Sequence, residues 1–201
     1  MTAKDIFESG NKRFETFKID GLRPALRYLN EGAMNDILNT NGCRYYQWST
    51  CLVEEFKPKQ IVELGGAMGV WDLCVLYTLP EMSNLFSITL KEHGLEFSYI
   101  KDKYNNFHPI IGDDLILSNW PKELDLNKTD IWFIDSLHEE TQLRKELDLY
   151  SPFFKKNAIV LLDDIHINEG MEKVWDELCS KYDYYDATDP LHYSGFGILT
   201  I

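Results

Sequence analysis

Two adjacent aspartates, Asp163 and Asp164, follow an apolar run and are the residues of the chain that most directly suggest chemistry. The run Ala158–Leu162 (AIVLL) has the continuous hydrophobicity of a strand buried on both faces. Two carboxylates at close range repel each other, and burial disfavours both charges. The pair therefore indicates either a strand that ends in solvent or a cation that binds between the side chains.

Acidic residues also lie at or just after the ends of three other apolar runs: Glu63, Asp113 with Asp114, and Asp135. In an open parallel sheet, ligands bind at the carboxyl ends of the strands, which all lie at one edge. A single acidic residue at such a place is more often a helix cap or a solvated loop residue. Their joint occurrence favours a functional site at this edge.

A glycine turn follows the first run, in the segment VELGGAMGVW. Gly65, Gly66 and Gly69 allow the backbone to approach a ligand closely before the next helix begins. The spacing is not that of a G-x-G-x-x-G fingerprint, because Ala67 and Val70 occupy two of its glycine positions. No P-loop lysine follows, so an NAD or ATP site is disfavoured, and a tight turn without a ligand is the alternative.

The elements that must position these residues alternate between short apolar runs and segments with helical spacing. The runs begin near Ile61, Leu85, His108, Asp130 and Ala158, and the helical segments between them include 136–150 and 168–182. This alternation predicts an α/β fold with a doubly wound, seven-stranded, mostly parallel sheet. Segments 182–187 and 196–201 are too close for a crossover helix and predict a C-terminal antiparallel hairpin. Ser136 and Glu139 have the spacing of a capping box.

The length of 201 residues predicts one domain, 1–201, with an N-terminal helical segment (1–58) and an α/β core (59–201). Helical spacing is visible at Ala25, Leu26 and Leu29, and again in 45–56. No run approaches the roughly 18 apolar residues of a membrane span. The charged N-terminus does not resemble a signal peptide, and four scattered cysteines lack metal-binding spacing. These features favour the cytoplasm.

The net charge of −13, from 33 acidic and 20 basic residues, argues against nucleic acid or an anionic membrane as partner. It favours a small molecule or a cation. A homodimer formed through the N-terminal helices is compatible with the sequence, although no motif specifies it.

The segments VELGGAMG, IIGDD, FIDSLH and LLDDIH together resemble the class I S-adenosylmethionine-dependent methyltransferases. More narrowly, they are similar to the metal-dependent O-methyltransferases of the catechol, macrolide-sugar and cephalosporin-hydroxylase-like type. The resemblance covers Ile61 to about Gly170. It implies methyl transfer from S-adenosylmethionine to a hydroxyl of a small molecule.

The resemblance also implies roles for particular residues. The methionyl end of the cofactor would lie against Gly65, Gly66, Ala67 and Gly69, supported by Glu63, and the adenine against Asp113 or Asp114. Asp135 would contact the cofactor and bind a divalent metal together with Asp163 and Asp164. Three carboxylates suit a hard cation such as Mg²⁺. The general base of the family corresponds to His138, expected in the first turn of the next helix; a partly exposed histidine without a role is the alternative. His166 is expected to be a plain loop histidine, with contact to the metal site or the substrate as the alternative.

The chain departs from the family at the end of its second strand. Thr89 stands where the family usually has an acidic residue that holds the cofactor's ribose, and Glu92 is the other residue that could make this contact. A milder departure is Lys156-Asn157 in place of a Gly-Gly turn, which Asn157 can replace because asparagine tolerates a left-handed backbone. Thr89 leaves open a non-catalytic binding protein of the same fold. An RNA ribose methyltransferase is the weaker alternative, disfavoured by the charge and by the missing lysine-rich catalytic set.

Overall fold

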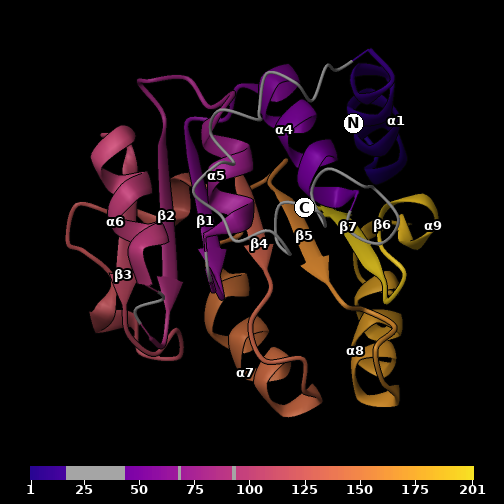
Figure 1. The fold of residues 1–201 in the computed structure, drawn as a ribbon. Helices are drawn as coiled ribbons and strands as arrows, with labels where there is room; N and C mark the ends of the chain where they lie inside the picture. The colour runs from indigo at the N-terminus through magenta and orange to yellow at the C-terminus, as the bar shows by residue number, and fades with distance from the viewer. Residues whose placement is uncertain (17–43, 68, 92–93) are drawn as a thin grey trace.

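A computed structural model of the chain describes residues 1–16, 44–67, 69–91 and 94–201 (Figure 1). The predicted helical set at Ala25, Leu26 and Leu29 lies outside these residues. The described residues form a seven-stranded sheet with helices on both faces.

The sheet has the strand order β3-β2-β1-β4-β5-β7-β6. Its strands are β1 (Gln60–Leu64), β2 (Asn84–Thr89), β3 (Phe107–Ile111), β4 (Ile131–Ile134), β5 (Ile159–Asp163), β6 (Asp183–Asp186) and β7 (Phe196–Thr200). The first five strands pair in parallel, and β7 runs antiparallel to both β5 and β6. The predicted doubly wound sheet and its C-terminal hairpin are confirmed. A short helix, α9 (Thr188–Leu191), lies within the connection of the hairpin.

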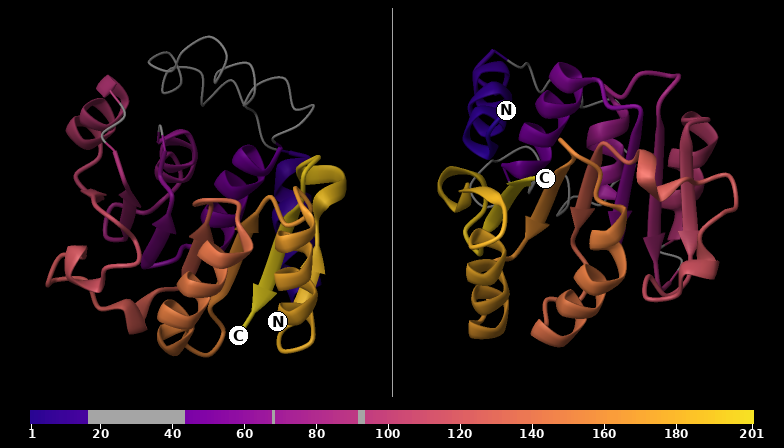
Figure 2. Two further views of the ribbon diagram at one scale, coloured as in Figure 1. Left: turned by 90° about the horizontal axis from the view of Figure 1, so that it is seen from below. Right: turned by 180° about the vertical axis from the view of Figure 1, so that it is seen from behind.

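The helices form two layers, one on each face of the sheet (Figure 2). One layer contains α1 (Ala3–Phe14), α4 (Tyr45–Phe56), α5 (Val70–Leu76) and α6 (Gly94–Lys103), and the other contains α7 (Glu140–Tyr150) and α8 (Glu169–Cys179). The sheet separates two hydrophobic clusters, each made of one layer and the strand side chains that face it. The central strands β1, β4 and β5 are therefore buried on both faces, which explains their continuous apolar runs.

Strand alternation places two of the acidic residues on the same face of the sheet. Phe133 of β4 is paired in register with Leu161 of β5, and both belong to the cluster under α4 and α5. Side chains alternate with a period of two along a strand. Asp135 and Asp163, each two positions further on, therefore extend from neighbouring strands toward α4.

Two local expectations need correction at the start of α7. This helix begins at Glu140 after Glu139, and no side chain caps it, so the predicted capping box is wrong. The hydroxyl of Ser136 instead donates to the carboxyl of Glu146, which is fully buried. His138 consequently lies in the β4–α7 loop and not in the first turn of the helix. The left-handed turn predicted at Asn157 is confirmed, with φ of 67°.

Replacement of Ile6 by alanine tests whether the N-terminal helix belongs to the same folding unit as the sheet. Ile6 is 2% exposed and lies in the core cluster on the α1 side. Its truncation should lower the free energy of unfolding by about 2–4 kcal/mol within one cooperative transition. Urea unfolding followed by tryptophan fluorescence and far-ultraviolet circular dichroism measures this. Lys4→Ala, at an exposed position of the same helix, should change it by less than about 0.5 kcal/mol. A separate early transition would show that α1 folds apart from the sheet.

Candidate active site

A pocket of about 440 Å³ lies at the carboxyl ends of β1 to β4. This volume is within the range of roughly 300–1,000 Å³ found for small-molecule sites. Six of the residues predicted to contact the cofactor line it: Gly65, Ala67, Thr89, Asp113, Asp114 and Asp135. The structure thus brings together residues that are up to 70 positions apart around one cavity at the expected edge of the sheet.

The other predicted cofactor residues are placed differently. Gly66 and Gly69 belong to the same turn but are not among the described residues that line the pocket, and Glu92 lies outside the described residues. Glu63 is buried, and its carboxyl accepts a hydrogen bond from Ser87 Oγ. Burial and the neighbouring carboxyl of Asp72 raise the pKa of Glu63 well above its usual value. Glu63 therefore supports the strand from within the protein and does not face the cavity.

The glycine turn has a conformation that other residues could not easily adopt. Gly65 has φ of +98°, and a Cβ atom there would lie 1.9 Å from the carbonyl oxygen of Asp135. The amides of Gly65 and Gly66 both donate to the Ile88 carbonyl, at 2.9 and 3.1 Å. Since both amides already donate to β2, they are not free to bind a ligand. The turn contributes by letting the backbone approach a ligand closely.

Asp113 and Asp114 differ in their surroundings at the far wall of the pocket. Oδ1 of Asp113 accepts from the amide of Leu115 at 2.9 Å, and this residue is partly exposed. Asp114 is buried and accepts from the side-chain amide of Gln142 at 3.1 Å. Burial raises the pKa of Asp114. Asp113 is thus the one with the more accessible carboxylate for a polar ligand group.

Glu146 of α7 lies behind this wall and is fully buried. Gln142 donates to its Oε1 at 2.8 Å, whereas its Oε2 has no hydrogen-bond partner in the described part of the chain. Burial raises the pKa of Glu146 to about 8. Burial therefore favours the neutral form of the Glu146 carboxyl group, which contacts Gln142 of the pocket wall.

His138 bridges two of the aspartates at the edge of the pocket. Its Nε2 lies 3.1 Å from Oδ1 of Asp135 and its Nδ1 lies 3.0 Å from Oδ2 of Asp164. Burial alone would lower the pKa of His138, but hydrogen bonds to the two carboxylates outweigh it and raise the pKa to about 10. The protonated imidazole is thus the cation that offsets the paired aspartates in this arrangement.

Asp163 has the least satisfied carboxyl group of the cluster. It is 4% exposed, and Tyr45 of α4 donates to its Oδ2 at 3.3 Å. Its Oδ1 is buried with no hydrogen-bond partner among the described residues. Burial, followed by the charges of Asp135 and Asp164, raises the pKa of Asp163 well above its usual range. A buried oxygen without a partner is the feature expected where a cation binds.

The residues of the cluster fit a divalent metal ion. Among the described residues, two sets offer ligand atoms that all lie within 4.8 Å of one another: Asp135, His138 and Asp163, and Asp163, Asp164 and His192. The three aspartates predicted as ligands are thus divided between two overlapping sets that share Asp163. Each set adds a histidine to two carboxylates.

The sequence places RYYQW and DPLHYSG among the segments expected to line an acceptor pocket, with core packing as the alternative, but it does not predict that Tyr45, His192 and Ser194 lie against the aspartates. The hydroxyl of Ser194 donates to Oδ1 of Asp164, and His192 lies 5.0 Å from Tyr45 between ring centroids. Their segments, RYYQW and DPLHYSG, are rich in aromatic and polar residues, but no spacing links them to the aspartates. His166, by contrast, pairs at the surface with Asp186 at 2.8 Å, as expected for a loop histidine.

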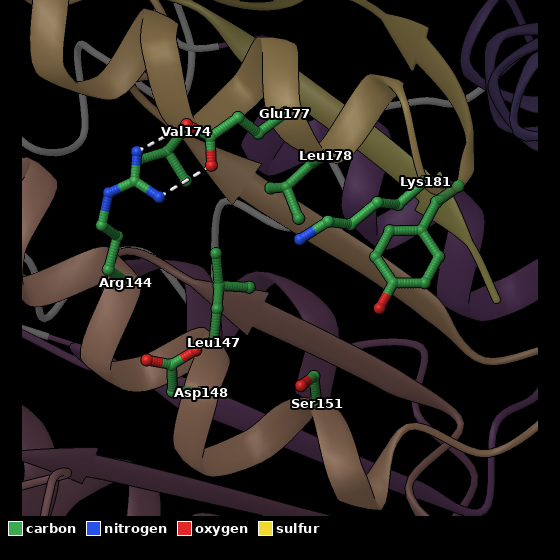
Figure 3. A pocket seen from close by; sticks show the side chains of 9 residues that line it. Arg144, Leu147, Asp148, Ser151, Val174, Glu177, Leu178 and Lys181 are labelled. Atoms are coloured by element: carbon green, nitrogen blue, oxygen red, sulfur yellow. Dashed lines mark hydrogen bonds and ion pairs between the residues drawn. The ribbon is translucent and has the colours of Figure 1, made fainter.

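A second, smaller cavity of about 130 Å³ lies between α7 and α8, away from the strand ends (Figure 3). Arg144 at its rim is held by Glu177 through two hydrogen bonds of 2.7 and 2.8 Å. Its charge is therefore already compensated within the protein. The acidic residues of its lining, Asp148 and Glu177, lie together with the basic residues Arg144 and Lys181.

Known proteins resemble the chain in sequence family and in fold. Residues 62–165 match the family described as "Methyltransferase domain", which is about half of the chain. The chain therefore belongs to the methyltransferase-domain family, and the methyltransferase class inferred from the motifs is confirmed. Among curated proteins, no sequence matches significantly. No helix in the described ranges has the length and hydrophobicity needed to cross a membrane.

Solved methyltransferases share the fold at low sequence identity. A methyltransferase from Geobacter sulfurreducens has a TM-score of 0.64 at 13% identity, over 89% of this chain and 90% of that one. An O-methyltransferase from Bacillus cereus in complex with SAH gives 0.60 at 13%, over 94% and 99%. Fibrillarin from Aeropyrum pernix with bound S-adenosyl-L-methionine gives 0.57 at 15%, over 71% and 66%. The pocket described here lies at the strand edge where ligands of such open α/β folds bind.

Replacement of Glu146 by glutamine should change how stability depends on pH. The pKa of about 8 in the folded protein lies above the usual value of 4.5, so folding favours the protonated form. This contribution is fully present below about pH 4.5 and is lost as the pH rises through about 8. Glutamine has no proton to lose in this range, so the free energy of unfolding of Glu146→Gln should not fall as the pH rises through about 8. The variant should therefore gain stability relative to wild type between about pH 4.5 and about pH 8.5.

Urea unfolding at several pH values measures this effect. The exposed Glu81→Gln variant serves as control and should follow the wild-type profile. An unchanged profile for Glu146→Gln would contradict the neutral state of the Glu146 carboxyl.

Proposed function

We propose that the protein transfers a methyl group from S-adenosylmethionine to a hydroxyl of a small molecule at a divalent metal centre. The observation that carries this proposal is the convergence of Asp135, His138 and Asp163 at the edge of the pocket. Methyl donor and hydroxyl acceptor would then meet where the carboxylates and the histidine lie.

The pocket suits the charge of the proposed cofactor. S-adenosylmethionine carries a positive sulfonium and an ammonium group, and Asp113, which has the more accessible carboxylate, lines the cavity together with Asp135. Apolar groups such as Ile88 and Leu115 provide contact area for an adenine. The bound SAH and S-adenosyl-L-methionine in the Bacillus cereus and Aeropyrum pernix structures support the same choice.

Asp135, Asp163 and Asp164 are proposed to hold the metal. The buried, unpartnered Oδ1 of Asp163 supports this, because an ion would supply the partner that the described residues do not. Hard cations such as Mg²⁺ prefer carboxylate oxygens. A bound divalent ion would polarise the substrate hydroxyl and stabilise the developing alkoxide.

His138 is proposed to remove the proton of the substrate hydroxyl. The two carboxylates hold its imidazole in place, and loss of either contact would bring its pKa closer to neutrality. A metal ion bound by Asp135 and Asp164 would take up the charge that keeps His138 protonated, so that its imidazole would be neutral and able to accept the proton of the hydroxyl. The hydroxyl oxygen would then attack the methyl carbon of the donor, and the electron pair of the broken carbon–sulfur bond would leave with S-adenosylhomocysteine. Positioning of donor and acceptor supplies much of the rate in such an in-line displacement.

A small molecule is the proposed acceptor. The net charge of −13 disfavours a polyanion as substrate, since binding a phosphate backbone needs a positive surface. Tyr45 of the aromatic segment RYYQW donates a hydrogen bond to Asp163, so this segment is the part of the N-terminal region proposed to lie next to the acceptor. Cytoplasmic location and a homodimer remain predictions from the sequence.

Titration calorimetry with S-adenosylmethionine and S-adenosylhomocysteine, with and without Mg²⁺, tests the proposed cofactor and metal. Absence of binding of either compound at millimolar concentration would refute the methyltransferase proposal. Binding that is indifferent to the metal, together with metal-independent turnover, would refute only the metal dependence.

Thr89→Val tests the ribose contact. Thr89 is 7% exposed and lines the pocket, and valine keeps its shape while removing the hydroxyl. One lost hydrogen bond should weaken S-adenosylhomocysteine binding by about 3- to 10-fold, measured by the same calorimetry. Unchanged affinity would show that Thr89 does not contact the ribose and would favour Glu92.

His138→Gln tests the proposed base. Methyl transfer from labelled S-adenosylmethionine to a panel of catechols and sugars should fall by about 10²- to 10⁴-fold, while S-adenosylhomocysteine affinity is retained. His166→Gln, which changes a surface histidine, should retain full activity. An active His138→Gln enzyme would refute the assigned base. A wild-type protein that binds the cofactor but methylates no member of a broad panel would favour the non-catalytic alternative.

A further inference from the structure

The loop between α9 and β7 is fixed directly against the paired aspartates. The amide of Asp164 donates to the Gly195 carbonyl at 2.9 Å, and the amide of His166 donates to the Ser194 carbonyl at 2.8 Å. Gly195 has φ of +114°, and a Cβ atom there would lie 2.6 Å from the backbone nitrogen of His166. This close approach requires glycine and holds His192 beside the cluster.

His192 lies near Oδ1 of Asp164, whereas His138 contacts the other oxygen of the same carboxylate, Oδ2. Its Nδ1 lies 3.6 Å from Oδ1 of Asp163 and 3.4 Å from Oδ1 of Asp164. The Asp163 oxygen is the buried atom that has no hydrogen-bond partner among the described residues. His192 itself is 6% exposed, so this nitrogen lies within the protein and not at its surface.

The distances from His192 Nδ1 to the two aspartate oxygens fit atoms that bind one metal ion better than they fit hydrogen bonds. A hydrogen bond between nitrogen and oxygen has a length of about 2.7–3.2 Å. Two ligand atoms that each lie about 2.1 Å from one ion are roughly 3.0–3.5 Å apart at the angles of octahedral or tetrahedral centres. The nitrogen–oxygen distances at His192 are close to the upper end of this range.

We propose that His192 is a nitrogen ligand of the metal centre and that it makes the site select a first-row transition ion, such as Mn²⁺ or Co²⁺, over Mg²⁺. The inference rests on the metal site of the proposed function and changes its metal preference. Imidazole raises affinity for transition ions, whereas Mg²⁺ takes oxygen ligands. A set of carboxylates with one buried imidazole therefore differs from an all-carboxylate site in the ion that it prefers.

Ser194 provides an alternative role for His192 that the test must separate. Ser194 donates its one hydroxyl proton to Asp164, so Nδ1–H of His192 is the donor to Ser194 Oγ at 3.0 Å, and metal binding by Nδ1 requires the tautomer with its proton on Nε2. A histidine that only supports Asp164 through this hydroxyl would never contact the ion. In that case Ser194→Ala would have the same effect as a change at His192.

Metal titrations of the full-length, chelator-treated protein test the proposal. Co²⁺ binding is followed by its visible absorption and by calorimetry, and Mg²⁺ binding by calorimetry and by competition against Co²⁺. Wild type should bind Co²⁺ at least about 100-fold more tightly than Mg²⁺. His192→Gln should lower Co²⁺ affinity by about 10- to 100-fold and change Mg²⁺ affinity by less than about threefold. His166→Gln is the matched control for a surface histidine and should match wild type.

Spin-echo spectroscopy of bound Mn²⁺ gives a readout that does not depend on affinity. Nitrogen coupling should be present in His138→Gln, where His192 is the remaining histidine of the cluster, and absent when both histidines are replaced. Nitrogen coupling that is missing in His138→Gln, or Co²⁺ affinity unchanged in His192→Gln, would overturn the proposal. Equal effects of Ser194→Ala and His192→Gln would do the same.

Binding of S-adenosylhomocysteine to the same samples separates this inference from the proposed function. Loss of the nitrogen signal with normal cofactor binding refutes only the role of His192. Absence of cofactor binding refutes the proposed function while the metal measurements still decide the role of His192.

Discussion

The crowding of three carboxyl groups at the ends of β4 and β5 is the constraint on which the site depends. Strand register places Asp135 beside Asp163 on one face, and Asp164 follows directly with a left-handed backbone (φ 55°). The mutual repulsion of such groups in a buried setting must be offset. His138 provides one positive charge from the pocket side, and Tyr45 and Ser194 donate hydrogen bonds from two other directions. Oδ1 of Asp163, which has no hydrogen-bond partner among the described residues, shows where this compensation is incomplete.

Crowded carboxyl groups also occur behind the pocket. Glu63 with Asp72, and Asp114 with Glu146, are carboxyl pairs whose burial raises the pKa of their members. Neutral carboxyls can share hydrogen bonds where ionised ones would repel. The protein thus uses two solutions for crowded acids: protonation in the interior, and cationic partners at the edge that faces the ligand.

Much of the fold could be predicted because it depends on local patterns. Continuous apolar runs identified the buried strands, and a period of 3.6 residues identified α7 and α8. General rules for parallel sheets then predicted that the carboxyl ends of β4 and β5 lie side by side at the ligand-binding edge. This placement predicted that Asp135 and Asp163 lie close together. The predicted capping box does not form because Ser136 donates its hydroxyl proton to Glu146, ten residues away, instead of capping a helix. Glu146 is buried, and a buried carboxyl group needs a hydrogen-bond donor. Tyr45 and His192 could not be predicted, since only three-dimensional contact links them to the aspartates.

The family match ends at residue 165, whereas the protein completes its acidic cluster from both sides of that boundary. Tyr45 reaches Asp163 across 118 positions of sequence, and Ser194 reaches Asp164 across 30. The region shared with the family thus contains the pocket and the carboxylates, while their partners on the α4 and β7 sides come from segments that the match does not include. Proteins can therefore have the same shared region and still differ in the groups that surround its carboxylates, because the flanking segments supply those groups.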